Sequence, residues 1–168
     1  MQFVSMADVF SKTKRSEVMS RIRSRGNKDT EVALVKLLRA HKISGWRRQV
    51  RLRVTSGESR VTGKARRSVA SPVTRHPPLT VRPDFVFQKS RTVIFVDGCF
   101  WHGCPKHATK PLNNRAFWRR KLSANKKRDR LVNGALRKAG WRVLRIWECD
   151  LARRPEVCVR RVERSLNR

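Results

Sequence analysis

Four cysteine and histidine residues fall within nine positions of this chain, in the segment Cys99-Phe-Trp-His102-Gly-Cys104-Pro-Lys-His107. A further cysteine, Cys149, follows far downstream in Trp-Glu-Cys. Structural zinc is held in a tetrahedron by four thiolate or imidazole ligands, so one ion would tie the two segments together. We expect Cys99, Cys104, His107 and Cys149 to be these ligands. Because the spacing is not that of common zinc fingers, two alternatives stay open: His102 replaces His107, or the cysteines are buried free thiols.

Basic residues dominate the surface chemistry of the chain. It has 42 Lys and Arg against 12 Asp and Glu, a net charge of +30 spread along its length. Such a surface binds polyanions, and release of counterions from a phosphate backbone makes the binding depend on salt. A nuclease, a ribosomal protein and a chromatin protein all fit this composition. No apolar stretch approaches the roughly 20 residues of a membrane span, and the start MQFVSMADVF lacks an export signal, so we expect a cytoplasmic protein without a membrane partner.

The length of 168 residues allows one domain with a sizeable core. Residues 1–28 form a basic arm that we expect to contact DNA, and residues 55–80, which show no sustained period, are interpreted as an inserted basic loop. Elsewhere the spacing of apolar residues predicts the following elements: helices over 29–41, 114–139 and 156–166, and strands over 49–54, 85–87, 92–96 and 141–147. This order predicts an α/β (α+β) fold in which helices flank a mixed sheet.

Two aspartates stand at the ends of the predicted hairpin strands. Asp84 precedes the first strand in Pro-Asp, and Asp97 ends the second. If these strands pair, both carboxylates lie at one edge of the sheet, where oxygen ligands can hold the Mg²⁺ that phosphodiester hydrolysis needs. The alternative is that each aspartate pairs with one of the many arginines.

The remaining histidine and the nearby aromatic residues complete the candidate site. His102 follows Asp97 closely, where an imidazole can transfer a proton or position a phosphate. Apolar side chains on a rigid loop of a DNA-binding protein can enter the base stack and expose a mismatch. We predict this role for Trp101 and Trp118, and a place in the core for Phe117.

These residues carry a resemblance to a known family. The segments RSEVMSRIRSRGNKDTE, RPDFVF, VIFVDGCFWHGCPKH, FWRRKLSANKKRDR and GWRVLRIWEC occur in this order, and the chain resembles the very-short-patch repair (Vsr) DNA mismatch endonucleases. The resemblance implies a restriction-endonuclease-like domain over residues 29–168. It also implies an enzyme that nicks duplex DNA 5′ to the thymine of a T:G mismatch arising from deamination of 5-methylcytosine.

The resemblance further implies roles for individual residues. Asp84 would bind the catalytic Mg²⁺ with the backbone carbonyl of Val96, and Glu31 would contact metal-bound water. Asp97 falls where the family has a polar active-site residue, and His102 matches its catalytic histidine. The structural Zn²⁺ ligands would be Cys99, Cys104, His107 and Cys149, and the intercalating aromatics Phe100, Trp101 and Trp118. A cytosine-5 DNA methyltransferase is implied as a functional partner, and we expect a monomer.

One segment departs from the family. Members run from the first strand to Pro-Asp through a short turn, whereas this chain has the basic stretch 55–80. Because the entropy of loop closure grows slowly with length, we expect activity to survive the insertion. It could nevertheless disturb the entry of Asp84 into its strand. The alternatives are therefore a nicking or restriction-type endonuclease of different specificity, and a DNA-binding module without activity.

Overall fold

A computed structural model describes residues 28–54, 79–107, 111 and 113–167, together with Thr13 and Glu17. Most of the predicted arm 1–28 and of the predicted loop 55–80 lies outside these residues. The helical elements are η1 (Lys28–Val32), α2 (Ala33–Ala40), α3 (Cys99–His102), α4 (Arg115–Lys138), α5 (Glu148–Arg153) and α6 (Pro155–Leu166). The strands are β1 (Trp46–Arg48), β2 (Leu52–Val54), β3 (Leu79–Val81), β4 (Phe85–Phe87), β5 (Thr92–Asp97) and β6 (Arg142–Trp147).

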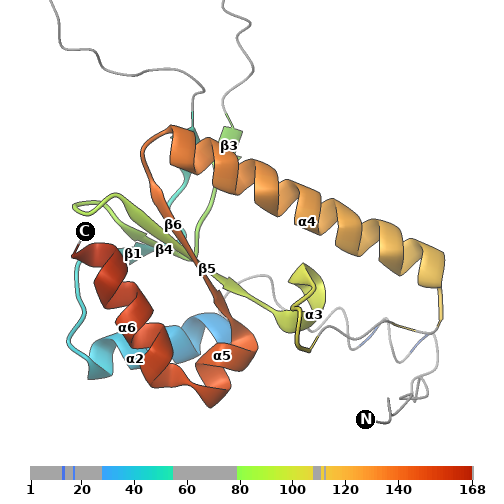
Figure 1. Ribbon diagram of the computed structural model, residues 1–168, viewed down its shortest axis with the longest axis horizontal. Helices are drawn as coiled ribbons and strands as arrows, with labels where there is room; N and C mark the ends of the chain where they lie inside the picture. Colours follow the sequence, from blue (N-terminus) through green and yellow to red (C-terminus); the bar gives the residue numbers. More distant parts are fainter. Residues whose placement is uncertain are drawn as a thin grey trace, which may run out of the picture.

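A four-stranded mixed sheet of order β1-β4-β5-β6 forms the centre of the fold. β4 pairs antiparallel with β1 and β5, whereas β5 and β6 run parallel, with Thr92 opposite Arg142 and Asp97 opposite Trp147. The parallel pair is connected through α4, which crosses one face of the sheet and extends beyond it (Figure 1). The predicted mixed sheet with flanking helices is confirmed.

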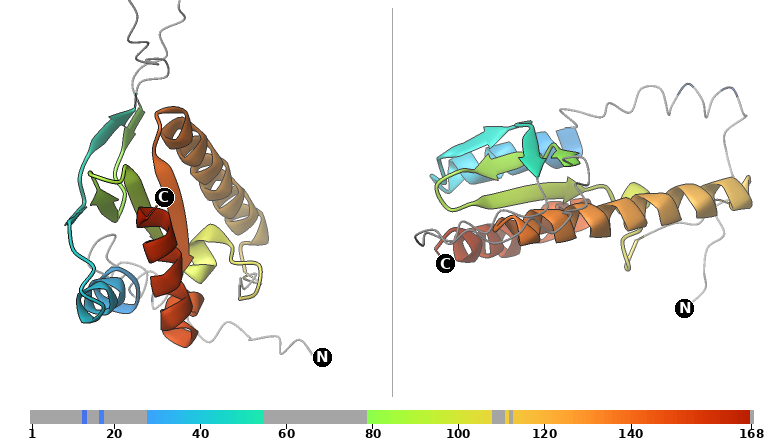
Figure 2. Two further views of the ribbon diagram at one scale, coloured as in Figure 1. Left: turned by 60° about the vertical axis from the view of Figure 1, so that its left-hand side comes forward. Right: turned by 90° about the horizontal axis from the view of Figure 1, so that it is seen from above.

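Both faces of this sheet are covered, because its strands direct alternate side chains to opposite sides. Phe85, Phe87 and Ile94 pack with residues of α2, α5 and α6 in one core cluster. Val86 and Val93 instead pack with Leu136 of α4 and with the β2–β3 pair. Figure 2 shows α6 and α4 on different sides of the sheet. Burial on both sides explains why β4 is entirely apolar.

The predicted strand over 49–54 is wrong in its first half, because only Leu52–Val54 (β2) is strand, and the preceding β1 (Trp46–Arg48) was not predicted. Gln49 has a φ of +56°, which ends β1 and redirects the chain. β1 therefore joins the central sheet, while β2 forms a separate antiparallel pair with β3. β3 includes residues 79 and 80 of the predicted loop, so that loop prediction was too long by its last two residues.

The other predicted elements are found within a few residues of their expected bounds, but in addition to β1 and β3 two short helices were not predicted. These are α3 and α5, which follow directly on β5 and β6. In the described part of the chain, no helix is long and apolar enough to cross a lipid bilayer.

Candidate active site and metal centre

Several polar side chains lie near the C-terminal end of β5, and Asp84, which directly precedes the neighbouring strand β4, is the central one. Pro83, which is fully buried, fixes the backbone just before it. Because Phe85 lies opposite Ile94 in the β4–β5 register, Asp84 comes level with the last residues of β5. Its Oδ2 accepts a hydrogen bond of 2.7 Å from the backbone N–H of Val96. The predicted approach of the two strand ends is thus observed.

Glu31 reaches the same place from η1, which contacts β5. Its side chain is buried and accepts hydrogen bonds from Arg48 Nη2 at 2.6 Å and from Gln49 Nε2 at 3.1 Å. The positive φ that turns the chain at Gln49 also places these two donors side by side. From the residues alone Glu31 was only a helix residue, and the resemblance alone indicated a role in the site.

The carboxyl groups at this edge influence one another. Burial is the main cause that raises the pKa of Asp84 from 3.8 to about 6, and the charges of Glu31 and Asp97 raise it further. The hydrogen bond from Val96 and the charge of His102 act in the opposite direction. Carboxyl groups that crowd a partly buried position favour a bound divalent cation, which offsets their repulsion. The donor set therefore fits the predicted Mg²⁺.

Asp97 lies beside Asp84 but is neutralised by an arginine of β6. Arg145 donates from Nε to Asp97 Oδ2 at 2.6 Å and from Nη2 to Asp97 Oδ1 at 2.8 Å. This bidentate geometry is the strongest form of arginine–carboxylate pairing. The alternative raised for a strand-end aspartate, a partner arginine, is therefore present, and a direct catalytic role of Asp97 stays a prediction.

His102, at the end of α3, is held by an aspartate that was not predicted. Its Nδ1 lies 2.7 Å from Asp129 Oδ2 and 3.7 Å from Asp97 Oδ1. Arg145 also pairs with Asp129, at 3.0 Å, so one guanidinium joins both carboxylates that face the histidine. Asp129 is the one acidic residue of α4, among ten Lys and Arg. A single aspartate in a basic helix is the one sequence feature that could have drawn attention to Asp129. The sequence does not tell which strand end this residue faces.

The register of β5 and β6 also assembles the cysteine–histidine cluster. Since Asp97 lies opposite Trp147, the residues two positions further along, Cys99 and Cys149, emerge side by side. Glu148 reinforces this arrangement by accepting a hydrogen bond of 3.0 Å from the backbone N–H of Cys99. Gly103 ends α3 with a φ of +64°, which lets Cys104 return toward Cys99.

The four atoms Cys99 Sγ, Cys104 Sγ, Cys149 Sγ and a His107 ring nitrogen lie within 4.8 Å of one another. Cys104 Sγ is 3.7 Å from Cys149 Sγ and 3.9 Å from His107 Nδ1. A tetrahedron with zinc–sulfur bonds of about 2.3 Å has edges of roughly 3.8 Å. The predicted residues therefore fit Zn²⁺, and His107 rather than His102 is the histidine in the cluster.

Two of these thiols differ in how readily they ionise. Burial, followed by contacts with the neighbouring thiols, raises the pKa of Cys99 to about 12. Burial also opposes ionisation of Cys104, but hydrogen bonds from Lys106 and His107 lower the pKa of this thiol to about 7. Closely spaced thiols cannot all ionise without a cation, and a bound metal supplies the positive charge that allows it.

Aromatic rings cluster where α3 meets the exposed end of α4. The Phe100 ring centroid lies 5.1 Å from those of Trp101 and Trp118, and Phe117 contacts Trp118 at 5.2 Å. Asn125 of α4 holds the backbone carbonyl of Trp101 at 3.0 Å. The predicted core position of Phe117 is wrong, because its side chain is 52% exposed on the part of α4 that extends past the sheet.

Comparison with known proteins connects this arrangement to a family. A profile of the family described as DNA mismatch endonuclease Vsr matches residues 74–110, which include Asp84, Asp97 and most of the cysteine–histidine cluster. The type II nicking enzyme V.NmeAIP of Neisseria meningitidis serogroup A is 33% identical over 161 residues, 95% of this chain and 94% of that protein.

Other relatives match over shorter stretches. The type II nicking enzyme V.NaeI of Lentzea aerocolonigenes is 53% identical over 68 residues, which cover 40% of this chain and 41% of that protein. The DNA mismatch endonuclease Vsr of Escherichia coli K12 is 44% identical over 77 residues, 45% of this chain and 49% of that protein. The chain thus spans less than half the length of these two relatives.

Proposed function

Because it matches V.NmeAIP over nearly its whole length and the Vsr profile at its central strands, this chain belongs to the Vsr family of DNA mismatch endonucleases, and we propose that it nicks one strand of duplex DNA 5′ to the thymine of a T:G mismatch. The observation that carries this proposal is the convergence of Asp84, Glu31 and His102 at the end of β5. The net charge of +30 supports a nucleic-acid substrate.

Asp84 and the backbone carbonyl of Val96 would hold the catalytic Mg²⁺, and Glu31 would hold water bound to it. When bound, the ion polarises the scissile phosphate and lowers the pKa of a coordinated water. Arg48 and Gln49 keep the Glu31 carboxylate fixed at this position. The Val96 N–H fixes one oxygen of Asp84 and leaves its other oxygen free for the ion.

His102 would transfer the proton. With Nδ1–H donated to Asp129, the imidazole presents the lone pair of Nε2, which would take a proton from the attacking water; the protonated Nε2 could then pass this proton to the leaving oxygen. Arg145 holds Asp129 in turn and compensates the negative charge around the ring. The imidazole thereby keeps one tautomer and one orientation.

The zinc cluster and the aromatic rings would supply mismatch recognition. Zn²⁺ held by the four clustered residues would join α3 to the start of α5 and would stiffen the chain that carries Phe100 and Trp101. Rings on a rigid support can enter the base stack beside a weakly paired T:G step. The exposed ring of Phe117 belongs to the same cluster, and we add it to the proposed intercalating residues.

A second substrate class is favoured by the names of two relatives. V.NmeAIP and V.NaeI are both described as type II nicking enzymes, so a nick set by flanking sequence is the alternative. In either case we propose double-stranded DNA as the partner, a monomer as the active form, and a functional link to a cytosine-5 DNA methyltransferase. The predicted arm 1–28 would add contacts to the DNA backbone.

The test is nicking of an end-labelled duplex that carries one T:G mismatch in varied flanks, beside the matched T:A duplex. Magnesium is omitted rather than chelated in the control, so that zinc stays bound. We expect a Mg²⁺-dependent nick 5′ to the mismatched thymine, and no nick with Asp84→Asn. Equal cutting of both duplexes would support the sequence-specific alternative. Binding without any cutting would leave a DNA-binding module.

A further inference from the structure

A second polar surface lies at the end of the sheet opposite the candidate active site. A groove of about 630 Å³ opens between the C-terminal ends of α4 and α6 and the start of β6. This end of the parallel strands β5 and β6 is marked by Thr92 and Arg142. The other end, five residues away, is marked by Asp97 and Trp147. At about 3.3 Å per residue the two ends are roughly 17 Å apart. We call this feature the arginine groove.

Four arginines from three elements line it: Arg137, Arg142, Arg161 and Arg164. In the parts of the chain that the structure describes, none of the four forms an ion pair with a carboxylate. Arg161 donates to the Arg145 carbonyl at 2.7 Å and Arg142 to the Ser90 carbonyl at 3.1 Å, which fixes their positions. The groove therefore carries positive charge, which Asp150 offsets in part at Arg161.

Two buried polar atoms at this place lack hydrogen-bond partners. They are Arg142 Nη1 and Ser90 Oγ, and among the described residues no other buried side-chain nitrogen or oxygen is unsatisfied. Both belong to one contact, because Arg142 Nη2 donates to the Ser90 carbonyl. Buried unpaired donors are costly, and of these two residues Arg142 is among those that line the groove.

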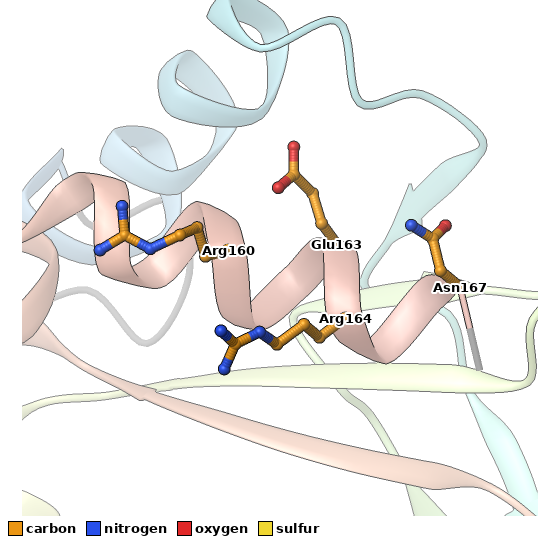
Figure 3. Close-up of a pocket in the computed structure, with 4 residues that line it drawn as sticks. All are labelled: Arg160, Glu163, Arg164 and Asn167. Carbon is orange, nitrogen blue, oxygen red and sulfur yellow. The ribbon is translucent and has the colours of Figure 1, made fainter.

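A neighbouring hollow of about 450 Å³ on α6 extends the arginine groove, since Arg164 lines both. Arg160, Glu163 and Asn167 line it as well. Figure 3 shows Glu163 and Arg164 pointing in different directions from α6, although both line the hollow, so the two side chains do not meet in an ion pair. The positive surface thus continues along the helix.

We propose that the arginine groove binds an acidic peptide segment of a partner protein. Carboxylates would pair with Arg137 and Arg164, which are exposed, while the peptide chain would lie along Trp141, Val143 and Leu144 of the edge strand β6, which also line the groove. Arginine binds carboxylates through paired hydrogen bonds, and a volume of this size matches that of ligand pockets.

The shape of the groove favours a peptide over DNA. A duplex presents its phosphates on a wide convex surface, whereas the groove follows the edge strand β6 between α4 and α6, a setting that fits an extended peptide segment. The basic segments of this chain would be repelled by the arginines, so we expect the acidic segment to come from another protein.

The test uses the full-length protein and a fluorescein-labelled peptide of glutamate and aspartate residues around two leucines, followed by fluorescence anisotropy. The double variant Arg137→Glu/Arg164→Glu is compared with Lys36→Glu/Arg39→Glu, an equal charge change at exposed positions of α2. We expect about tenfold weaker binding for the groove variant and less than about twofold for the α2 variant. Circular dichroism verifies that both variants are folded.

A competition experiment completes the design. The peptide should stay bound when saturating matched duplex DNA is added, and a counterpart with Gln and Asn in place of the acids should not bind. Equal weakening in both double variants would show diffuse charge attraction instead of a site. Displacement of the peptide by the duplex would make the groove part of the DNA-binding surface. Either result would overturn the proposal, and neither depends on nicking activity.

Discussion

The raised pKa of Asp84 predicts that removing its charge stabilises the protein while it abolishes activity. A pKa of about 6 in place of 3.8 means that the folded protein binds this proton more tightly than the unfolded chain. The resulting stabilisation is present below about pH 4 and is lost as the pH rises through 6. At about 1.4 kcal/mol per pKa unit, ionised Asp84 lowers the free energy of unfolding by up to about 3 kcal/mol at pH 8. Asp84→Asn avoids this cost.

The measurement is urea unfolding of the zinc-loaded protein without magnesium, at pH 4.5 and pH 8. We expect Asp84→Asn to exceed the native chain in stability by about 1–3 kcal/mol at pH 8 and by much less at pH 4.5. Added Mg²⁺ should narrow the difference at pH 8, because it binds only the native site. Glu163→Gln, which changes an exposed carboxylate, is the control and should change stability by less than about 0.5 kcal/mol. An equal gain at both pH values would refute the reasoning.

Three further predictions concern catalysis, the metal centre and the insertion. His102→Ala should lower the rate of single-turnover nicking by about 10²- to 10⁴-fold, and Asp129→Asn should lower it by about tenfold. The affinity of both variants for DNA, measured by anisotropy, should not change. A comparable loss of affinity would indicate a structural role instead. Cys149→Ser should remove about one zinc per chain, measured by elemental analysis, and lower the melting temperature; unchanged zinc content would exclude this ligand set. Replacing residues 55–78 by Asn-Gly should preserve folding and nicking, measured by circular dichroism and the mismatch assay, whereas loss of nicking in a folded variant would assign the insertion a role in activity.

The spacing of apolar residues predicted those helices and strands that are determined by a short stretch of sequence. The apolar runs that became β4 and β5, and the spacing that became α4, are decided within a few residues. The division of residues 46–54 between two sheets depends on the left-handed backbone of Gln49, and no period of apolar residues reports a single φ angle. The short helices α3 and α5 likewise follow from how the chain leaves a strand end.

The site divides in the same way. The cysteine–histidine cluster was predicted because four cysteine and histidine residues in one short segment indicate a metal site even when the fold is unknown, and Cys149 is a further cysteine. Asp129 and Arg145 were not predicted, because their roles arise only when α4 and β6 pack beside β5. An aspartate within a basic helix and an arginine within a strand have many possible partners. Only the packing of α4 and β6 beside β5 brings Asp129 and Arg145 next to His102.

The same register explains how the chain can carry a long segment next to its catalytic aspartate. Val54 and Leu79, which bound residues 55–78, lie opposite each other in the β2–β3 pair, so the chain leaves and returns at adjacent positions. Val81, at the other end of β3, is buried against α4, and Pro83 is buried directly before Asp84. A change of length beyond Val54 is therefore absorbed at the far end of this pair. The position of Asp84 depends instead on its Val96 hydrogen bond and on the pairing of β4 with β5.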